Sequence, residues 1–331
     1  MLSMERAGNE MYRSDDEMRV GIVYHEDFLL HEHSPTHPER RERLMYTMDQ
    51  LEEEGIFDLP GIIRFEPHKA SRKDLARVHD ESYLDELKSL SAGSEGKAID
   101  KEGETIIQKP TYEQAKLAAG GAIMSAELVM DEEVDRSFLL ARPGGHHAFK
   151  DHGHGFCFTN NLAIAIEKIK VKYGLEKILL WDWDAHHFDG TQSIFYSDPS
   201  VFTISTHQDG RTLFPGSGFI DEIGKGRGKG YNVNVPLPPI TSDEGYLKVV
   251  EEIFVPLARS YEPQVLINLA VTAKGYSKMM KKAVNLSDEL CEGKIIASLG
   301  GGYGIEGGLP YTNLAVIASL AGMDTGNIKE P

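Results

Sequence analysis

Two adjacent histidines lie in a segment with the residue types of a hydrolytic site. His146 and His147 follow Arg142-Pro143-Gly144-Gly145, shortly after an apolar run at residues 138–140. On a loop flanked by glycines both imidazoles can face one cleft, where a neutral imidazole takes a proton from water and an imidazolium returns it to a leaving amine. An isolated histidine pair is more often an ordinary surface or core feature, so the interpretation depends on what accompanies it.

A second polar segment follows another apolar run. In Trp181-Asp182-Trp183-Asp184-Ala185-His186 the side chains of Asp182, Asp184 and His186 alternate, and in extended geometry alternate side chains share a face. Carboxylate and imidazole are suitable ligands for a transition metal such as zinc. Burying these groups is costly unless a cation or hydrogen-bond partners compensate, so a metal site is favoured over a polar strand end without metal.

The elements around these segments indicate an α/β fold. Apolar runs of strand length occur at residues 20–24, 138–140, 178–181, 201–205, 265–270 and 295–299. Helical stretches separate them, among them residues 71–90, residues 111–130 with Thr111 as the cap, and a helix opened by proline at His37-Pro38-Glu39-Arg40. This alternation predicts a single domain with a mostly parallel central sheet and helices on both faces. Functional residues then gather at the carboxyl ends of the strands.

Domain limits and composition are equally simple. We expect a poorly ordered leader at residues 1–18 and one catalytic domain at residues 19–331. The formal charge of −17 and pI near 5.2 disfavour nucleic acid and anionic membranes as partners and favour cationic substrates. Two distant cysteines give no disulfide framework and no thiolate zinc site. With no signal-like or membrane-spanning apolar stretch, the sequence predicts a cytoplasmic protein.

Taken together, the two polar segments resemble the histone deacetylase family, which includes the acetylpolyamine amidohydrolases. The resemblance runs from Tyr24-His25 to Gly322. It is carried by further segments in a shared order: His37-Pro38-Glu39-Arg40, Gly155-Phe156-Cys157-Phe158-Thr159-Asn160-Asn161, Phe214-Pro215-Gly216-Ser217-Gly218, Asn234-Val235-Pro236-Leu237-Pro238 and Gly301-Gly302-Tyr303.

The resemblance implies roles for the polar residues of both segments. Asp184 and His186 would be metal ligands, and His146 and His147 would handle the protons of the water and the leaving group. Asp182 would orient His146. The fold implied is that of the arginase and deacetylase enzymes, and the cofactor is Zn²⁺, with Fe²⁺ or Co²⁺ suited to the same ligands.

The same resemblance implies the rest of the site. Asp189 would hydrogen-bond His147, and Tyr303 would donate its hydroxyl to the substrate carbonyl oxygen. Gly155, Phe156 and Phe214 would line a narrow tunnel for an uncharged acyl-lysine-like arm. The substrate would be an acylated amine, either an acyl-lysine peptide or an acetylpolyamine. The sequence leaves that choice, the acyl-chain preference and the oligomeric state open.

One part of the family pattern is absent. The family usually supplies a third metal ligand, an aspartate in a loop after the strand that here is residues 265–270. In this sequence the strand runs directly into Val271-Thr272-Ala273, although such connections usually need about 2 to 6 residues. Either the printed sequence leaves out a loop that the protein has, or the protein itself lacks the loop. In the second case Asp184 and His186 alone would bind metal weakly.

Smaller departures and two rival functions complete the expectations. Gly145, Phe188 and Gly300 differ from the residues common in relatives. A degenerate, non-catalytic binding protein would explain the missing aspartate, but His146, His147 and Tyr303 argue against it. An arginase-like binuclear manganese hydrolase shares Asp184-Ala185-His186, but Phe188 occupies the position of a bridging carboxylate.

Three further polar sites are expected to be minor. His31, His33 and His37 should be surface histidines near a helix start, with adventitious metal binding as the alternative. His152 and His154 lie beside the expected cleft and are candidates for lining it. Cys157 should be a buried packing thiol.

Overall fold

The computed structural model of the 331-residue chain describes residues 18–93, 96–270, 273–306 and 308–328. Nearly all of the expected leader, and Val271 and Thr272 at the junction where the aspartate loop is expected, lie outside the described residues. Within the described ranges, no helix is long and apolar enough to cross a membrane.

An eight-stranded sheet forms the centre of the described part of the chain, and every pair of neighbouring strands is parallel. In spatial order the strands are β2 (Ile62–Phe65), β1 (Val20–Val23), β5 (Arg136–Leu139), β10 (Ile295–Leu299), β9 (Val265–Ala270), β6 (Ile178–Asp182), β7 (Val201–Gln208) and β8 (Asn232–Leu237). The four strands β1, β5, β6 and β10 are buried along their whole length, as expected for strands covered on both faces. The predicted single α/β domain is therefore confirmed.

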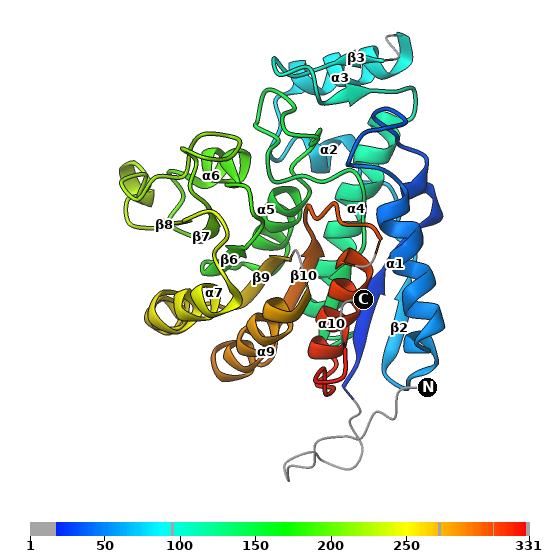
Figure 1. The fold of residues 1–331 in the computed structure, drawn as a ribbon. Coiled ribbons are helices and arrows are strands. Elements are labelled where there is room, and N and C mark those ends of the chain that lie inside the picture. Colours follow the sequence, from blue (N-terminus) through cyan, green and yellow to red (C-terminus); the bar gives the residue numbers. More distant parts are fainter. Residues whose placement is uncertain (1–17, 94–95, 271–272, 307, 329–331) are drawn as a thin grey trace.

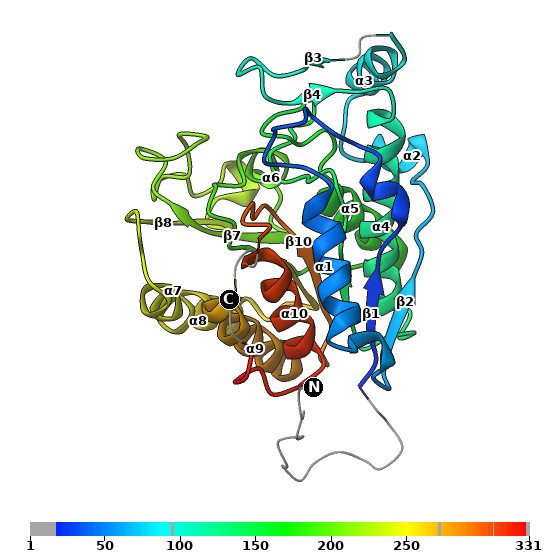
Figure 2. The same ribbon diagram turned by 45° about the vertical axis from the view of Figure 1, so that its right-hand side comes forward.

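Helices cover both faces of this sheet. The ten α-helices of the described ranges are α1 (Glu42–Glu53), α2 (Arg72–Leu75), α3 (Glu81–Gly93), α4 (Thr111–Met130), α5 (Asn161–Tyr173), α6 (Asp189–Phe195), α7 (Asp243–Val249), α8 (Val255–Tyr261), α9 (Ala273–Leu290) and α10 (Gly308–Leu320). A π-helix, η4 (Val250–Phe254), joins α7 to α8, and short 3₁₀ helices occur at η1 (Glu26–Leu29), η2 (Ile56–Asp58) and η3 (Gly226–Gly228). Helix α10 packs on α1 and α9, and α4 packs on α5; Figures 1 and 2 show the sheet between these two groups.

Three of the helix predictions were wrong in detail. The single helix expected at residues 71–90 is broken into α2 and α3. Between them, His79 Nε2 accepts a hydrogen bond from the backbone N–H of Asn160 at 2.9 Å, which stabilises the break. Thr111 begins α4 but does not cap it; Pro110 is the N-cap, and the Thr111 hydroxyl bonds to Gln108 and His31 instead. Helix α1 begins at Glu42, after the proline that was expected to open it.

A small antiparallel pair lies apart from the main sheet. Strands β3 (Lys97–Ala98) and β4 (Ile106–Ile107) enclose the segment 99–105, and Figure 1 shows them with α3 at the top of the molecule. The strands of the main sheet run toward this end. Segment 99–105 therefore lies near the edge where the polar loops emerge.

Candidate active site

The carboxyl ends of adjacent parallel strands bring the candidate residues together. The loop after β5 carries His146 and His147, the loop after β6 carries Asp184 and His186, and the loop after β10 carries Tyr303. Strands β5, β10, β9 and β6 are consecutive neighbours in the sheet, so their carboxyl ends meet along one edge.

Each tandem histidine is held by a different carboxylate. The Nδ1 atom of His146 lies 2.9 Å from Asp182 Oδ2, and the Nδ1 atom of His147 lies 2.6 Å from Asp189 Oδ1. The imidazole centroids are 4.0 Å apart, and all four side chains are buried. A carboxylate at Nδ1 fixes the proton there, so each neutral ring presents an unprotonated Nε2.

The two histidines differ in charge. Burial acts to lower the pKa of His146, but the charge of Asp182 and its hydrogen bond outweigh burial and raise the pKa to about 9. Burial, followed by the charge on His146, lowers the pKa of His147 to about 4. Near neutral pH the pair therefore holds one imidazolium and one neutral imidazole, which suits an acid and a base acting side by side.

Asp184 and His186 lie together, but not through strand alternation as expected. Strand β6 ends at Asp182, and each carboxylate accepts the backbone N–H two residues further on: Asp184 N to Asp182 Oδ1 at 2.8 Å, and His186 N to Asp184 Oδ1 at 2.9 Å. These local turns place Asp184 Oδ1 3.0 Å from His186 Nδ1. Although burial opposes it, the neighbouring His146 and His186 hold the pKa of Asp184 well below its usual range, so that it stays a carboxylate.

This donor set fits a divalent transition metal in its chemistry, because a carboxylate oxygen and an imidazole nitrogen converge from one short turn. The absence of a side chain at Gly301 keeps the space beside Asp184 open. A Cβ on Gly301 would lie 2.7 Å from Asp184 Oδ2 and 3.4 Å from the Tyr303 hydroxyl, and the Gly301 N–H donates to that Asp184 oxygen at 2.6 Å. Among the described residues, however, neither of the two groups of three potential ligands includes Asp184 or His186. Of the predicted metal site, the described residues thus offer two potential ligands, Asp184 and His186.

Tyr303 and the aromatic residues border a cavity next to the histidines. This cavity is lined by His146, Gly155, Phe156, Gly301 and Tyr303, among other residues. Burial raises the pKa of the Tyr303 hydroxyl, which keeps it protonated and able to donate. The Phe156 and Tyr303 rings are 6.0 Å apart.

The remaining predicted wall residues lie against His147. The ring of Phe214 is 5.1 Å from the ring of His147. Gly155 has φ +52°, and a Cβ there would come within 2.5 Å of the His147 ring, so the position requires glycine. Cys157 is buried, and burial raises the pKa of its thiol, which agrees with the expected packing role.

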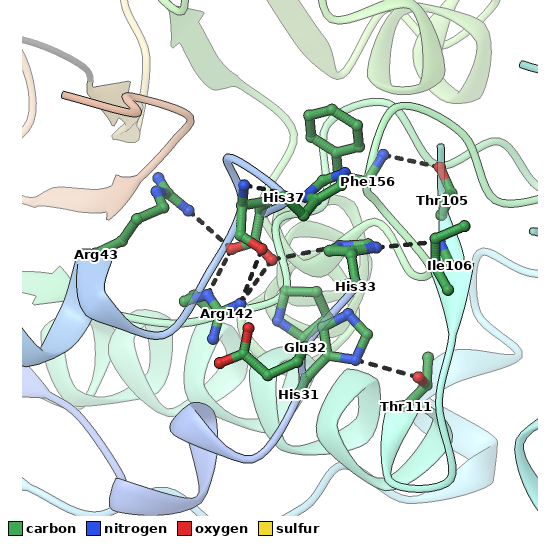
Figure 3. A network of polar contacts seen from close by, with 12 residues as sticks. His31, Glu32, His33, His37, Arg43, Thr105, Ile106, Thr111, Arg142 and Phe156 are labelled. Carbon is green, nitrogen blue, oxygen red and sulfur yellow. Dashed lines mark hydrogen bonds and ion pairs between the residues drawn. The ribbon is translucent and has the colours of Figure 1, made fainter. Parts of the chain in front are cut away.

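The histidine-rich loop is not a surface feature, and this correction reveals residues that the sequence interpretation missed. His31 and His33 are fully buried, and with Glu39 they form a compact group of potential ligands. Figure 3 shows His31 and His33 in a network of polar contacts with Arg43 and Arg142 on one side. Arg142 donates to Glu39 from Nε at 2.5 Å, and Arg43 donates from Nη1 at 3.0 Å.

The chemistry of this buried group argues against a metal. The Ile106 N–H donates to His33 Nδ1 at 3.1 Å, so the proton of neutral His33 is on Nε2, which lies 3.4 Å from Glu39 Oε2 and is not free to bind a cation. Two buried guanidinium groups would also repel a divalent ion. Although burial opposes it, these arginines hold the pKa of Glu39 well below its usual range. The group is therefore an ion-pair network.

This network supports the catalytic turn. Arg43 donates to Gly302 O at 2.8 Å and to Gly300 O at 2.7 Å, and also to Gly301 O. Its guanidinium lies 5.0 Å from the centroid of the Tyr303 ring. Arg43 thus holds the backbone that carries Tyr303. The motif His37-Pro38-Glu39-Arg40 was the only sequence signal for this support.

Known proteins resemble this chain over most of its length. The family model for the histone deacetylase domain matches residues 37–319. A probable deacetylase of Archaeoglobus fulgidus is 48% identical over 95% of this chain and 89% of its own length, and a histone deacetylase-like amidohydrolase of Pseudomonas aeruginosa is 34% identical over 79% and 71%. The solved HDA15 HD domain has a TM-score of 0.85 and 32% identity, covering 92% of this chain and 90% of that one. Such relatives support a deacetylase-type hydrolase activity.

Proposed function

Because this chain belongs to the histone deacetylase family, we propose that it is a zinc-dependent deacetylase that hydrolyses the acetyl or acyl amide of an acyl-lysine or acetylpolyamine type of substrate. The observation that carries the proposal is the convergence of two histidine–aspartate pairs beside the Asp184–His186 pair and the Tyr303 turn. General base, general acid, metal donors and an oxyanion donor are thus provided at one sheet edge.

The protein residues divide the chemistry. His147, neutral near pH 7, takes a proton from the attacking water through Nε2, while Asp189 supports the positive charge that forms. The Tyr303 hydroxyl donates to the substrate oxygen as negative charge develops there. An imidazolium of the pair then protonates the departing amine. A metal ion held by Asp184 and His186 would supply polarisation of the carbonyl and acidification of the water.

The surroundings support an acylated amine as the substrate. Phe156 and Phe214 provide apolar surfaces for a methylene arm, and Gly155 allows that arm to approach His147. A formal charge of −17 attracts substrates that carry positive charge elsewhere, as lysine-rich peptides and polyamines do.

Zinc is the proposed metal, with Fe²⁺ or Co²⁺ as alternatives for a carboxylate and imidazole donor set. With only two ligands among the described residues, we expect the metal to be held weakly and to be removed and restored reversibly. A non-catalytic protein that binds acylated ligands is the second candidate, and the same two-ligand set is the observation that favours it.

The test combines metal analysis with turnover. Protein of verified mass is titrated with Zn²⁺, and the release of amine from an acetyl-lysine peptide and from an acetylated polyamine is measured for the wild type and Tyr303→Phe. The proposal expects about one metal per chain, hydrolysis of one substrate class, and a loss of roughly 100-fold or more in kcat for the variant. Acyl-ligand binding without turnover at saturating metal would establish the binding protein instead.

A further inference from the structure

The carboxylate of Asp189 lies between two imidazoles, only one of which belongs to the tandem pair. Its Oδ1 atom is 2.6 Å from His147 Nδ1 and also accepts the Gly190 N–H at 2.9 Å. Its Oδ2 atom is 3.2 Å from His154 Nε2. Because both oxygens are held, the plane of the carboxylate is fixed relative to the His147 ring.

The second ring nitrogen of His154 faces another carboxylate. His154 Nδ1 lies 3.4 Å from Glu102 Oε2, and Glu102 is on the segment between β3 and β4. Interaction with a carboxylate at each nitrogen requires a proton on each, which is the imidazolium form. Although burial lowers the pKa of His154, the hydrogen bond and charge of Asp189 and the charge of Glu102 raise it overall.

His154 itself is firmly placed. Its backbone exchanges two hydrogen bonds with Cys157, at 3.0 and 2.9 Å. Its ring lies 4.9 Å from that of Phe214 and 5.9 Å from that of Phe149, and 14% of its side chain is exposed. Its neighbour His152 differs: half of that side chain is exposed, and it pairs with the exposed Asp151.

The segment that presents Glu102 is also ordered by its own hydrogen bonds. Asp100 accepts the backbone N–H groups of Gly103, Glu104 and Thr105 at 3.0 Å each. These bonds use both oxygens of Asp100, so the group of Asp100, Glu102 and His154 is better explained as a braced loop than as a cation site. Thr105 Oγ1 accepts the N–H of the tunnel residue Phe156 at 2.9 Å.

From these contacts we propose that His154 is a positioning residue for catalysis: it fixes Asp189 against His147 and connects that pair, through Glu102, to the outer segment 99–105. The inference rests on the proposed function, because His147 is the group whose orientation matters for turnover. Through His154 and Asp189, the outer segment 99–105 would then influence the rate of the chemical step.

The experiment compares three variants of the full chain. His154→Leu removes both nitrogens, His154→Gln keeps a donor near the position of Nε2, and His152→Gln is the matched control. The first measurement is the proton resonance of His147 Nδ1–H, which is shifted downfield by the short bond to Asp189 and is observed in histidine-labelled protein. The corresponding His146 resonance is the internal reference. Both resonances can be observed without turnover. The second measurement is kcat and KM with saturating metal.

We expect His154→Leu to move the His147 resonance upfield, to leave that of His146 in place, and to lower kcat roughly 10-fold with KM nearly unchanged, in line with losses of orienting partners. His154→Gln should restore most of kcat, and His152→Gln should change nothing. If His154→Leu folds poorly, Glu102→Ala at a largely exposed position should move the His154 ring resonances and lower kcat severalfold.

An unchanged His147 resonance in His154→Leu would overturn the inference, as would equal losses of kcat in His154→Leu and His152→Gln. If no variant and no wild-type protein hydrolyses an acylated amine, the proposed function fails while the resonances still test whether His154 orients the pair. The two ideas can therefore fail separately.

Discussion

Among the buried histidines of the described residues, the pairs His146–His147 and His31–His33 differ in their partners at Nδ1. In His146 and His147 the Nδ1 atoms face carboxylates, which leaves Nε2 as the unprotonated nitrogen of each neutral ring. In His33 the Nδ1 atom accepts a hydrogen bond from the backbone N–H of Ile106, and Nε2 faces Glu39 Oε2 at 3.4 Å. The partner at Nδ1 therefore distinguishes the proposed catalytic imidazoles from the scaffolding ones, whereas burial and residue type do not.

The largest effect should come from removing the proposed base. We expect His147→Gln to lower kcat by roughly 10³-fold, because an amide cannot accept the proton of water, and general acid and base groups typically contribute 10² to 10⁴. Turnover is measured at equal metal content, with His33→Asn as the control from the other pair. A loss below tenfold in His147→Gln would contradict the comparison.

The ion-pair network of Glu39, Arg43 and Arg142 should be important for stability. Glu39→Gln removes the negative charge between Arg43 and Arg142, and uncompensated buried charges cost about 3 to 5 kcal/mol. Urea denaturation measures the free energy of unfolding. The control is Glu42→Gln, whose partner Arg40 lies 3.9 Å away near the surface, and which should change stability by less than about 0.5 kcal/mol. Similar losses of unfolding free energy in both variants would show that the buried network stabilises the fold no more than a surface ion pair does.

Within the catalytic pair, the orienting carboxylate should matter less than the base itself. Asp189→Asn weakens the partner that holds the proton on His147 Nδ1. We expect kcat of the folded variant to fall roughly 10- to 100-fold. Single-turnover rates at saturating substrate provide the measurement. A variant that loses substrate affinity but keeps its chemical rate would assign Asp189 to binding.

The acceptor at Nδ1 of His33 gives a finer test. His33→Asn can keep an acceptor near Nδ1 for the Ile106 N–H, whereas His33→Leu leaves that N–H unpaired, at a cost of about 1 to 3 kcal/mol. The two variants are compared by urea denaturation. Equal stability would mean that ring packing, and not the hydrogen bond, holds this loop.

The central sheet was predictable because its buried strands are short apolar runs, and residues 265–270 and 295–299 match β9 and β10 fully. Edge strands β2 and β8 were missed. Strand β2 is largely exposed, and β8 has asparagines among its buried positions, so neither is an uninterrupted apolar run. Hydrophobic patterns therefore predict central strands, which are buried on both faces, better than they predict edge strands.

The candidate site was predictable where its residues are local and not where they depend on distant partners. Asp182, Asp184 and His186 are close in the chain, and their convergence was expected, although by strand alternation and not through turns. His33 was placed at the surface because its partner Ile106 is 73 positions away. The pairing of His154 with Asp189 was missed for the same reason.

Another buried histidine, His79, extends the comparison to pH dependence. Its Nε2 accepts the Asn160 N–H, and burial lowers the pKa of His79 to about 4 from an unfolded value near 6.5. Above pH 6.5 both states are neutral and the pKa difference has no effect. As the pH falls below 6.5 the unfolded state takes up the proton first, so stability should fall by about 1 kcal/mol between pH 7 and pH 5.5. Urea denaturation at these pH values measures this slope, and His79→Gln should reduce it. An equal slope in the variant would assign the pH dependence to the other buried histidines whose pKa is lowered, such as His147 and His207.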